Sequence, residues 1–234
     1  MTESEHQIIR LESVNMIYEH RHVLTDVNLT VNRGDFVAIT GPNGGGKTTL
    51  LRIILKLLRP TSGTVEYLDG EGCQVNSLHI GYLPQKNKID SRFPITVREV
   101  VRSGLLAEKG IGRDEIAVRV DAMLRLMGLD NHASNGLGEL SGGQMQRALL
   151  GRALISKPSV VVLDEPLSYV DKRFEHHIYD IMERIKGEAT VILVSHEISA
   201  IASMANRLLI VDGRLHHCNS SMHMARYDSC DWTD

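Results

Sequence analysis

The chain has 234 residues, of which 26 are Lys or Arg and 29 are Asp or Glu, and its formal net charge is −3. Hydrophobic residues make up 42% of the chain, enough to bury a core, and the slightly acidic balance argues against a broad basic face for nucleic acid. The chain has three cysteines, and such a small, odd number does not suggest a disulfide framework. This cysteine content fits a reducing compartment. No apolar run approaches the roughly 18 residues that span a bilayer, and the acidic N-terminus is unlike a signal peptide. We therefore expect a soluble chain that is not exported.

Strand-like and helix-like segments alternate along the chain, which predicts an α/β fold. Apolar and polar residues alternate in residues 27–31, as in a half-buried strand, and residues 32–35 predict a turn. Short apolar runs at residues 36–39, 160–163, 191–194 and 208–211 predict buried, parallel strands. From about residue 94 to 140 the pattern is helical, at 96–104 and 113–127. We predict one domain over residues 1–234, with a helical insertion at about 94–140 and a C-terminal tail at about 216–234.

A glycine-rich segment between a predicted strand and a predicted helix indicates a nucleotide. Residues 41–48, here called the phosphate loop, match G-x-x-x-x-G-K-[ST] in full. Backbone amides in such a loop point at phosphate oxygens, Lys47 supplies a cation for the β- and γ-phosphates, and Thr48 offers a hydroxyl to Mg²⁺. The alternative, a glycine-rich turn that merely resembles the motif, is disfavoured by the strand–loop–helix context. The residues expected to bind nucleotide here are Gly41, Pro42, Asn43, Gly44, Gly45, Gly46, Lys47, Thr48 and Thr49.

Two carboxylates follow the apolar run at residues 160–163. Open α/β sheets bind ligands at the carboxyl ends of their strands, where Asp164 and Glu165 emerge. Asp164 is expected to hold Mg²⁺, and Glu165 is expected to polarise the attacking water as a general base. A solvated Asp-Glu pair in a loop is the alternative, and the upstream phosphate loop argues against it.

The segment Leu140-Ser141-Gly142-Gly143-Gln144, here called the signature tip, decides the family. Together with the two motifs above it resembles the signature of ATP-binding cassette (ABC) ATPases. Ser141 and the two glycines precede a helical stretch, so this is a helix N-terminus whose amides suit an anion. The resemblance implies that the tip meets the γ-phosphate of ATP held by a second copy, in a head-to-tail homodimer. It also implies a P-loop NTPase cassette: a mostly parallel core sheet, an N-terminal antiparallel β part and an inserted α-helical subdomain.

The resemblance assigns roles to four further residues. Tyr18 matches an aromatic that stacks on adenine, with an ordinary strand tyrosine as the alternative. Gln85 matches a glutamine that senses Mg²⁺ and the attacking water. His196 matches a switch histidine that bonds the γ-phosphate and Glu165. Asp171 matches a loop that bridges the two copies, although Tyr169 and Val170 depart from the usual Ser-Ala-Leu-Asp.

Single-cassette chains of this length resemble the ATPase subunits of bacterial importers. Residues 80–104 and 143–154 resemble the zinc/manganese branch, which implies transport of a divalent metal ion through a separate integral-membrane permease. The resemblance further implies a cytoplasmic protein, peripheral on the inner face of the membrane, and, indirectly, an extracytoplasmic metal-binding protein. An iron-chelate importer and an export or lipoprotein-release system are the alternatives. Translation or DNA-repair ATPases normally need two cassettes or long coiled coils, which 234 residues do not accommodate.

The C-terminal segment contains several possible zinc ligands. One hypothesis is that the tail binds metal and damps the ATPase when cytosolic metal is high. The alternative is a chance enrichment, which we favour because the spacing fits no standard zinc module. The residues concerned are His216, His217, Cys218, His223 and Cys230.

Overall fold

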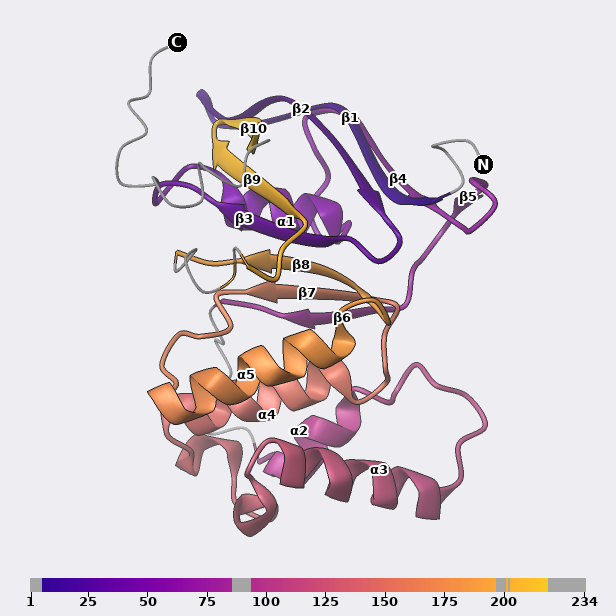
Figure 1. Cartoon of the computed structure of the whole chain (residues 1–234), viewed down its shortest axis with the longest axis vertical. Coiled ribbons are helices and arrows are strands. Elements are labelled where there is room, and N and C mark those ends of the chain that lie inside the picture. Colours follow the sequence, from indigo (N-terminus) through magenta and orange to yellow (C-terminus); the bar gives the residue numbers. More distant parts are fainter. Residues whose placement is uncertain (1–5, 86–93, 197–200, 202, 219–234) are drawn as a thin grey trace. The chain divides into compact units, whose positions relative to one another are not determined.

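A computed structural model describes residues 6–85, 94–196, 201 and 203–218 (Figure 1). The chain forms two compact units. Unit 1 comprises Met1–Leu78 and Thr190–Asp234, and unit 2 comprises His79–Ala189. The helical insertion predicted at about residues 94–140 therefore belongs entirely to unit 2.

An antiparallel sheet forms one part of unit 1, with the strand order β2-β1-β4-β5. It consists of β1 (Gln7–Tyr18), β2 (Arg21–Asn32), β4 (Ser62–Leu68) and β5 (Gln74–Val75). Val27, Leu29 and Val31 of β2 are buried and alternate with polar residues, as the sequence pattern predicted. The expected N-terminal antiparallel part is confirmed.

A second group of strands in unit 1 carries the buried parallel pairs. Here β3 (Phe36–Thr40) lies between β8 (Thr190–Val194) and β9 (Arg207–Asp212) and is parallel to both. Every residue of β3 and β8 is buried, which explains why both read as continuous apolar runs. The helix α1 (Lys47–Ile54) follows β3 and the phosphate loop.

The start of the predicted C-terminal tail is a strand. β10 (Arg214–Cys218) pairs antiparallel with β9 through a tight turn at Gly213, whose φ is 67°. The tail predicted from about residue 216 is therefore wrong for its first three residues, because they complete this hairpin. Residues 219–234 lie outside the described part of the chain.

Unit 2 contains a parallel strand pair and most of the helices. β6 (Ile80–Leu83) pairs with β7 (Val160–Asp164), α4 (Gly142–Leu154) packs against β6, and α2 (Val97–Ser103) packs against α4 and α3 (Arg113–Leu126). In Figure 1 the strand pair, α4 and α2 form successive layers of this unit. The remaining elements are α5 (Lys172–Ile185) and the short 3-10 helices η2 (Asp130–His132) and η3 (Leu137–Glu139).

The start of α2 is set by a capping box. Thr96 Oγ1 accepts from the Glu99 backbone amide at 3.3 Å, and a Glu99 carboxylate oxygen accepts from the Thr96 amide at 2.8 Å. The bond from the Thr96 backbone amide, followed by a second one from the Thr96 hydroxyl at 2.7 Å, lowers the pKa of Glu99. Both helices predicted in the insertion are confirmed.

Helix α5 was not predicted from the sequence, although its apolar residues have helical spacing. Phe174, Ile178, Ile181 and Met182 are buried along one side of this helix. Their spacing of four, three and one residues follows the helical period. Strands β4 and β6 were also not predicted, because they are short and only partly buried.

No helix in the described residue ranges combines the length and the apolar character that crossing a membrane requires.

Candidate functional site

The phosphate loop in unit 1 has the backbone shape that only glycine allows. Gly41 has a φ of 140° and Gly46 a φ of 101°. A Cβ on Gly41 would lie 2.1 Å from the carbonyl oxygen of Val211, and one on Gly46 would lie 2.9 Å from that of Val23. Strands β9 and β2 thus pack directly against the loop and hold its curl in place.

Lys47 begins α1 and turns back into the loop. Its ammonium donates to the carbonyl oxygens of Gly41 at 2.8 Å and Pro42 at 2.9 Å, and the side chain is buried. Because the helix is capped by Gly46, no cap side chain occupies its first amides. A buried cation and a helix N-terminus therefore act on the same loop, which is the electrostatic setting that a phosphate chain requires.

The register of two parallel strands brings His196 to the edge that carries the phosphate loop. Ile39 of β3 pairs with Val194 of β8, and the Ser195 amide donates to the Ile39 carbonyl at 3.1 Å. Gly41 and His196 each lie two residues beyond this pair, and His196 is exposed. Parallel pairing thus places these two predicted site residues at the carboxyl ends of neighbouring strands.

Tyr18 ends β1 at a turn that lies beside the phosphate loop. It is 43% exposed and pairs with Arg21 across the hairpin. A guanidinium nitrogen of Arg21 would lie 3.9 Å from a Cβ on Gly44. The Tyr18 ring is therefore accessible, as stacking on a base requires, and its strand partner reaches the phosphate loop. Its role in binding adenine stays a prediction.

In unit 2 a matching register gathers the other catalytic candidates. Leu83 of β6 pairs with Leu163 of β7, so Gln85 and Glu165 each lie two residues past the same rung. Asp164 is the last residue of β7 and is 1% exposed, whereas Gln85 is exposed. All three side chains belong to the carboxyl edge of this strand pair.

Glu165 adopts a strained backbone. Its φ is 55°, in the left-handed region, which costs a non-glycine residue of order 1–3 kcal/mol. Its carbonyl oxygen accepts from the buried Gln146 amide at 3.3 Å and from the Ser168 backbone amide at 3.2 Å. Gln146 was missed by the sequence analysis, although it follows the signature tip by only two residues. Strain held by surrounding bonds is typical of functional positions.

The signature tip is a capped helix N-terminus, as predicted. Ser141 Oγ accepts from the Gln144 backbone amide at 3.3 Å, and Gln144 Oε1 accepts from the Ser141 amide at 3.0 Å. Gly143 is packed against Tyr169, since a Cβ there would lie 2.7 Å from the Tyr169 carbonyl oxygen. Ser141 and Gly142 remain exposed. The tip can therefore approach a ligand from outside the unit.

Asp171 has a structural position that the sequence analysis did not predict. It caps α5, where its carboxylate accepts from the Phe174 amide at 2.9 Å, and it forms an ion pair with Arg147 of α4 at 2.5 Å. The backbone bond, followed by the Arg147 charge, lowers the pKa of Asp171. The Arg147 guanidinium also lies 3.9 Å from the Phe174 ring centre. The predicted contact of Asp171 with a second copy stays a prediction.

The donor chemistry of three candidates fits Mg²⁺. Thr48, Gln85 and Asp164 offer hydroxyl, amide and carboxylate oxygens, the ligands that this ion prefers. A cluster of three His, Cys, Asp or Glu side chains that could hold a metal ion is not found among the described residues.

The described part of the C-terminal segment does not converge on a metal. His216, His217 and Cys218 are consecutive in β10, so the side chain of the middle residue points to the opposite face from its neighbours. Desolvation, followed by the Arg207 charge, lowers the pKa of His217. The other proposed ligands, His223 and Cys230, lie outside the described residues, as do Ile89, Asp90 and Phe93 of the importer-like segment.

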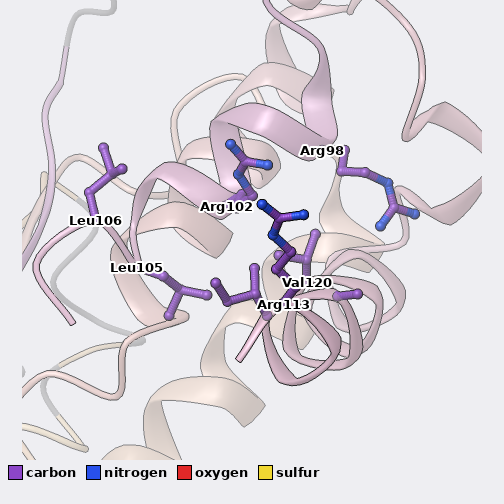
Figure 2. Close-up of a pocket in the computed structure, with 8 residues that line it drawn as sticks. Arg98, Arg102, Leu105, Leu106, Arg113 and Val120 are labelled. Atoms are coloured by element: carbon purple, nitrogen blue, oxygen red, sulfur yellow. The ribbon is translucent and has the colours of Figure 1, made fainter. Parts of the chain in front are cut away.

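A pocket of about 450 Å³ lies between α2 and α3 of unit 2 (Figure 2). Three arginines and five apolar side chains line it, without an acidic residue among the eight. One of the three, Arg98, forms an ion pair with Asp121 at 2.7 Å. Leu106 is 82% exposed. This arginine pocket comprises Arg98, Arg102, Leu105, Leu106, Arg113, Ile116, Ala117 and Val120.

Known proteins share this sequence pattern and fold. The family described as ABC transporter matches residues 24–168. The chain is 38% identical over 207 residues to the zinc import ATP-binding protein ZnuC of Pasteurella multocida, which covers 88% of this chain and 73% of that protein. It is 32% identical to the zinc uptake system ATP-binding protein ZurA of Listeria innocua, over 89% of this chain and 84% of that protein.

A dimeric ATP-binding cassette in a post-hydrolysis state, bound to ADP and Pi, has a TM-score of 0.78 and 26% identity and covers 91% of this chain and 100% of that one. A dimeric bacterial ABC transporter cassette has a TM-score of 0.79 and 28% identity, and the match covers 89% of this chain and 97% of that one. The match over most of the chain, the shared fold and the phosphate loop, strand-end carboxylates and signature tip lead to one conclusion: the chain belongs to the ABC transporter family and is an ATPase cassette of that family.

Proposed function

We propose that the chain is the ATP-binding and ATP-hydrolysing subunit of a transporter that moves a divalent metal ion, zinc or manganese, through a separate membrane permease. The observation that carries the ATPase part is the phosphate loop, where the buried Lys47 ammonium and the N-terminus of α1 serve one glycine cradle. The metal substrate is supported by the relatives, which are named as zinc import and zinc uptake ATP-binding proteins.

The proposed hydrolysis assigns one task to each group. The loop amides and Lys47 bind the β- and γ-phosphates. Glu165 accepts a proton from the water that attacks the γ-phosphorus, the bond from that phosphorus to the bridging oxygen breaks, and ADP and phosphate leave. His196 and Gln85 orient the γ-phosphate and the water. Thr48, Asp164 and Gln85 would hold Mg²⁺, which would supply positive charge against the phosphates.

Two copies are proposed to enclose two ATP molecules. The exposed signature tip of one copy, with Ser141, Gly142, Gly143 and Gln144, would contact ATP on the phosphate loop of its partner. Asp171 would lie in the loop that joins the copies. The two dimeric cassettes with similar folds support this arrangement.

The arginine pocket is proposed as part of the surface that meets the permease. Its apolar lining and exposed Leu106 suit the apolar face of a cytoplasmic helix, and Arg102 and Arg113 suit carboxylates beside that face. The cassette would then lie on the inner face of the cell membrane. An extracytoplasmic metal-binding protein would deliver the ion to the permease from the other side.

A single substitution tests the ATPase proposal. Glu165→Gln removes the proton acceptor and should lower turnover about 10²- to 10⁴-fold, with ATP binding retained. The assay is phosphate release by the cassette reconstituted with its permease in lipid vesicles, followed by Zn²⁺ and Mn²⁺ uptake into the same vesicles. Glu188→Gln, at an exposed turn after α5, is the matched control. Normal turnover of Glu165→Gln would refute the assignment.

A further inference from the structure

His132 lies beside the signature tip and is not among the residues that the sequence analysis singled out. It is the last residue of η2, and its Nε2 atom lies 3.1 Å from Nε2 of Gln144. Gln144 is the residue whose side chain completes the capping box of Ser141. The histidine therefore touches the group that caps the tip.

The hydrogen-bond network determines which atom donates. The backbone amide of Ser141 can only donate, and its partner at 3.0 Å is Oε1 of Gln144. The other end of the Gln144 side chain is therefore the NH₂ group, which can only donate. His132 Nε2 must accept this bond, so the imidazole is neutral and carries its proton on Nδ1.

Backbone bonds hold η2 in place. The His132 amide donates to the Leu129 carbonyl at 3.0 Å, and the Asn135 amide donates to the His132 carbonyl at 3.0 Å. The following residue, Ala133, accepts from the first turn of α2, through the Arg98 amide at 3.0 Å. Leu129 is fully buried. The backbone from which the imidazole projects is therefore fixed by the packing of unit 2.

We propose that His132 is a positioning residue for the signature tip. By accepting from Gln144, it holds the amide oxygen of Gln144 against the Ser141 backbone, and so it fixes the direction in which Ser141 and the first amides of α4 face. The proposal rests on the proposed function, in which this tip binds ATP held by a second copy. Without the acceptor at position 132, the Gln144 side chain can rotate and the tip loses one of its two capping bonds.

Replacing His132 should affect dimer formation, which uses the signature tip, and not the binding of ATP to the phosphate loop of a single copy. A net hydrogen bond contributes about 0.5–1.5 kcal/mol, which corresponds to about a twofold to tenfold change in the affinity of each tip for ATP on the partner copy. In a Glu165→Gln background, His132→Ala should raise the ATP concentration that half-saturates dimer formation by at least this factor. The affinity of the monomer for ATP should not change, because Lys47 and the phosphate loop are untouched.

Matched variants and one spectroscopic measurement test the proposal. In the same Glu165→Gln background, His132→Gln places an amide oxygen near the Nε2 position and should restore dimer formation. His176→Ala, at an exposed histidine of α5, should form dimers at the same ATP concentration as the background protein. Nitrogen NMR of labelled histidine should show His132 protonated at Nδ1 and not at Nε2. Thermal unfolding monitors folding of each variant.

Three results would overturn the proposal: wild-type dimer formation in His132→Ala, no rescue in His132→Gln, or a proton on Nε2 of His132. Failure of the proposed function is distinguishable, since then the wild type itself would neither pair nor hydrolyse ATP. The NMR measurement would still decide the hydrogen-bond network in that case.

Discussion

The close packing of the signature tip against the loop after β7 predicts different effects of the same substitution at two adjacent glycines. A Cβ on Gly143 would lie 2.7 Å from the Tyr169 carbonyl oxygen, whereas one on Gly142 would lie at an ordinary 3.5 Å from the Tyr169 side chain. Tyr169 has little room to retreat, because its φ is already 68° and Asp171 anchors the next turn as the cap of α5. Gly143→Ala must therefore push α4 away from this loop.

The magnitude follows from two terms. Replacing glycine by alanine in a helix stabilises by up to about 1 kcal/mol, and this term is shared by both variants. Overpacking a rigid contact costs about 1–3 kcal/mol, and this term applies to Gly143→Ala alone. We expect Gly142→Ala to be neutral or slightly stabilising, and Gly143→Ala to have a free energy of unfolding about 1–3 kcal/mol below that of Gly142→Ala.

Urea unfolding of the nucleotide-free protein, followed by circular dichroism, measures this difference. At this chain length it corresponds to a gap in Tm of roughly 2–12 °C. The measurement is made without nucleotide because both substitutions lie in the tip that is proposed to bind ATP. Without nucleotide, only the strain that Gly143→Ala introduces into the fold separates the two variants. Equal stabilities for the two variants would refute the reasoning, since the Tyr169 contact would then not constrain α4.

Three further predictions use other parts of the molecule. Lys47→Ala should weaken ATP binding roughly tenfold to a hundredfold, because charged hydrogen bonds contribute about 1.5–3 kcal/mol, and unchanged affinity by titration calorimetry would count against the phosphate loop. Burial raises the pKa of Tyr67 to about 12. An unfolded tyrosine ionises near pH 10, so the free energy of unfolding should fall as pH rises from about 10 to about 12, and Tyr67→Phe should flatten that slope. Asp171→Ala removes the cap on the Phe174 amide and the partner of Arg147, so it should lower Tm, whereas Asp180→Ala on the same helix should change it little; equal shifts would contradict the capping role.

Local chemistry made several features predictable from the sequence. The phosphate loop needs glycines and a lysine at fixed spacing, and this spacing is visible in residues 41–48 without a structure. Buried parallel strands such as β3, β7 and β8 are apolar on both faces, so they read as short continuous runs. Family, fold class and the helical insertion follow from such local patterns.

Contacts between distant residues were decided only by the tertiary structure. Strand pairing aligns His196 with the phosphate loop and Gln85 with Glu165, across gaps of 155 and 80 residues. The bonds from His132 to Gln144 and from Asp171 to Arg147 likewise depend on how helices pack, which a single sequence does not encode in any local pattern. Residue type and spacing therefore determined which chemistry the chain can carry, and packing decided which atoms hold that chemistry in position.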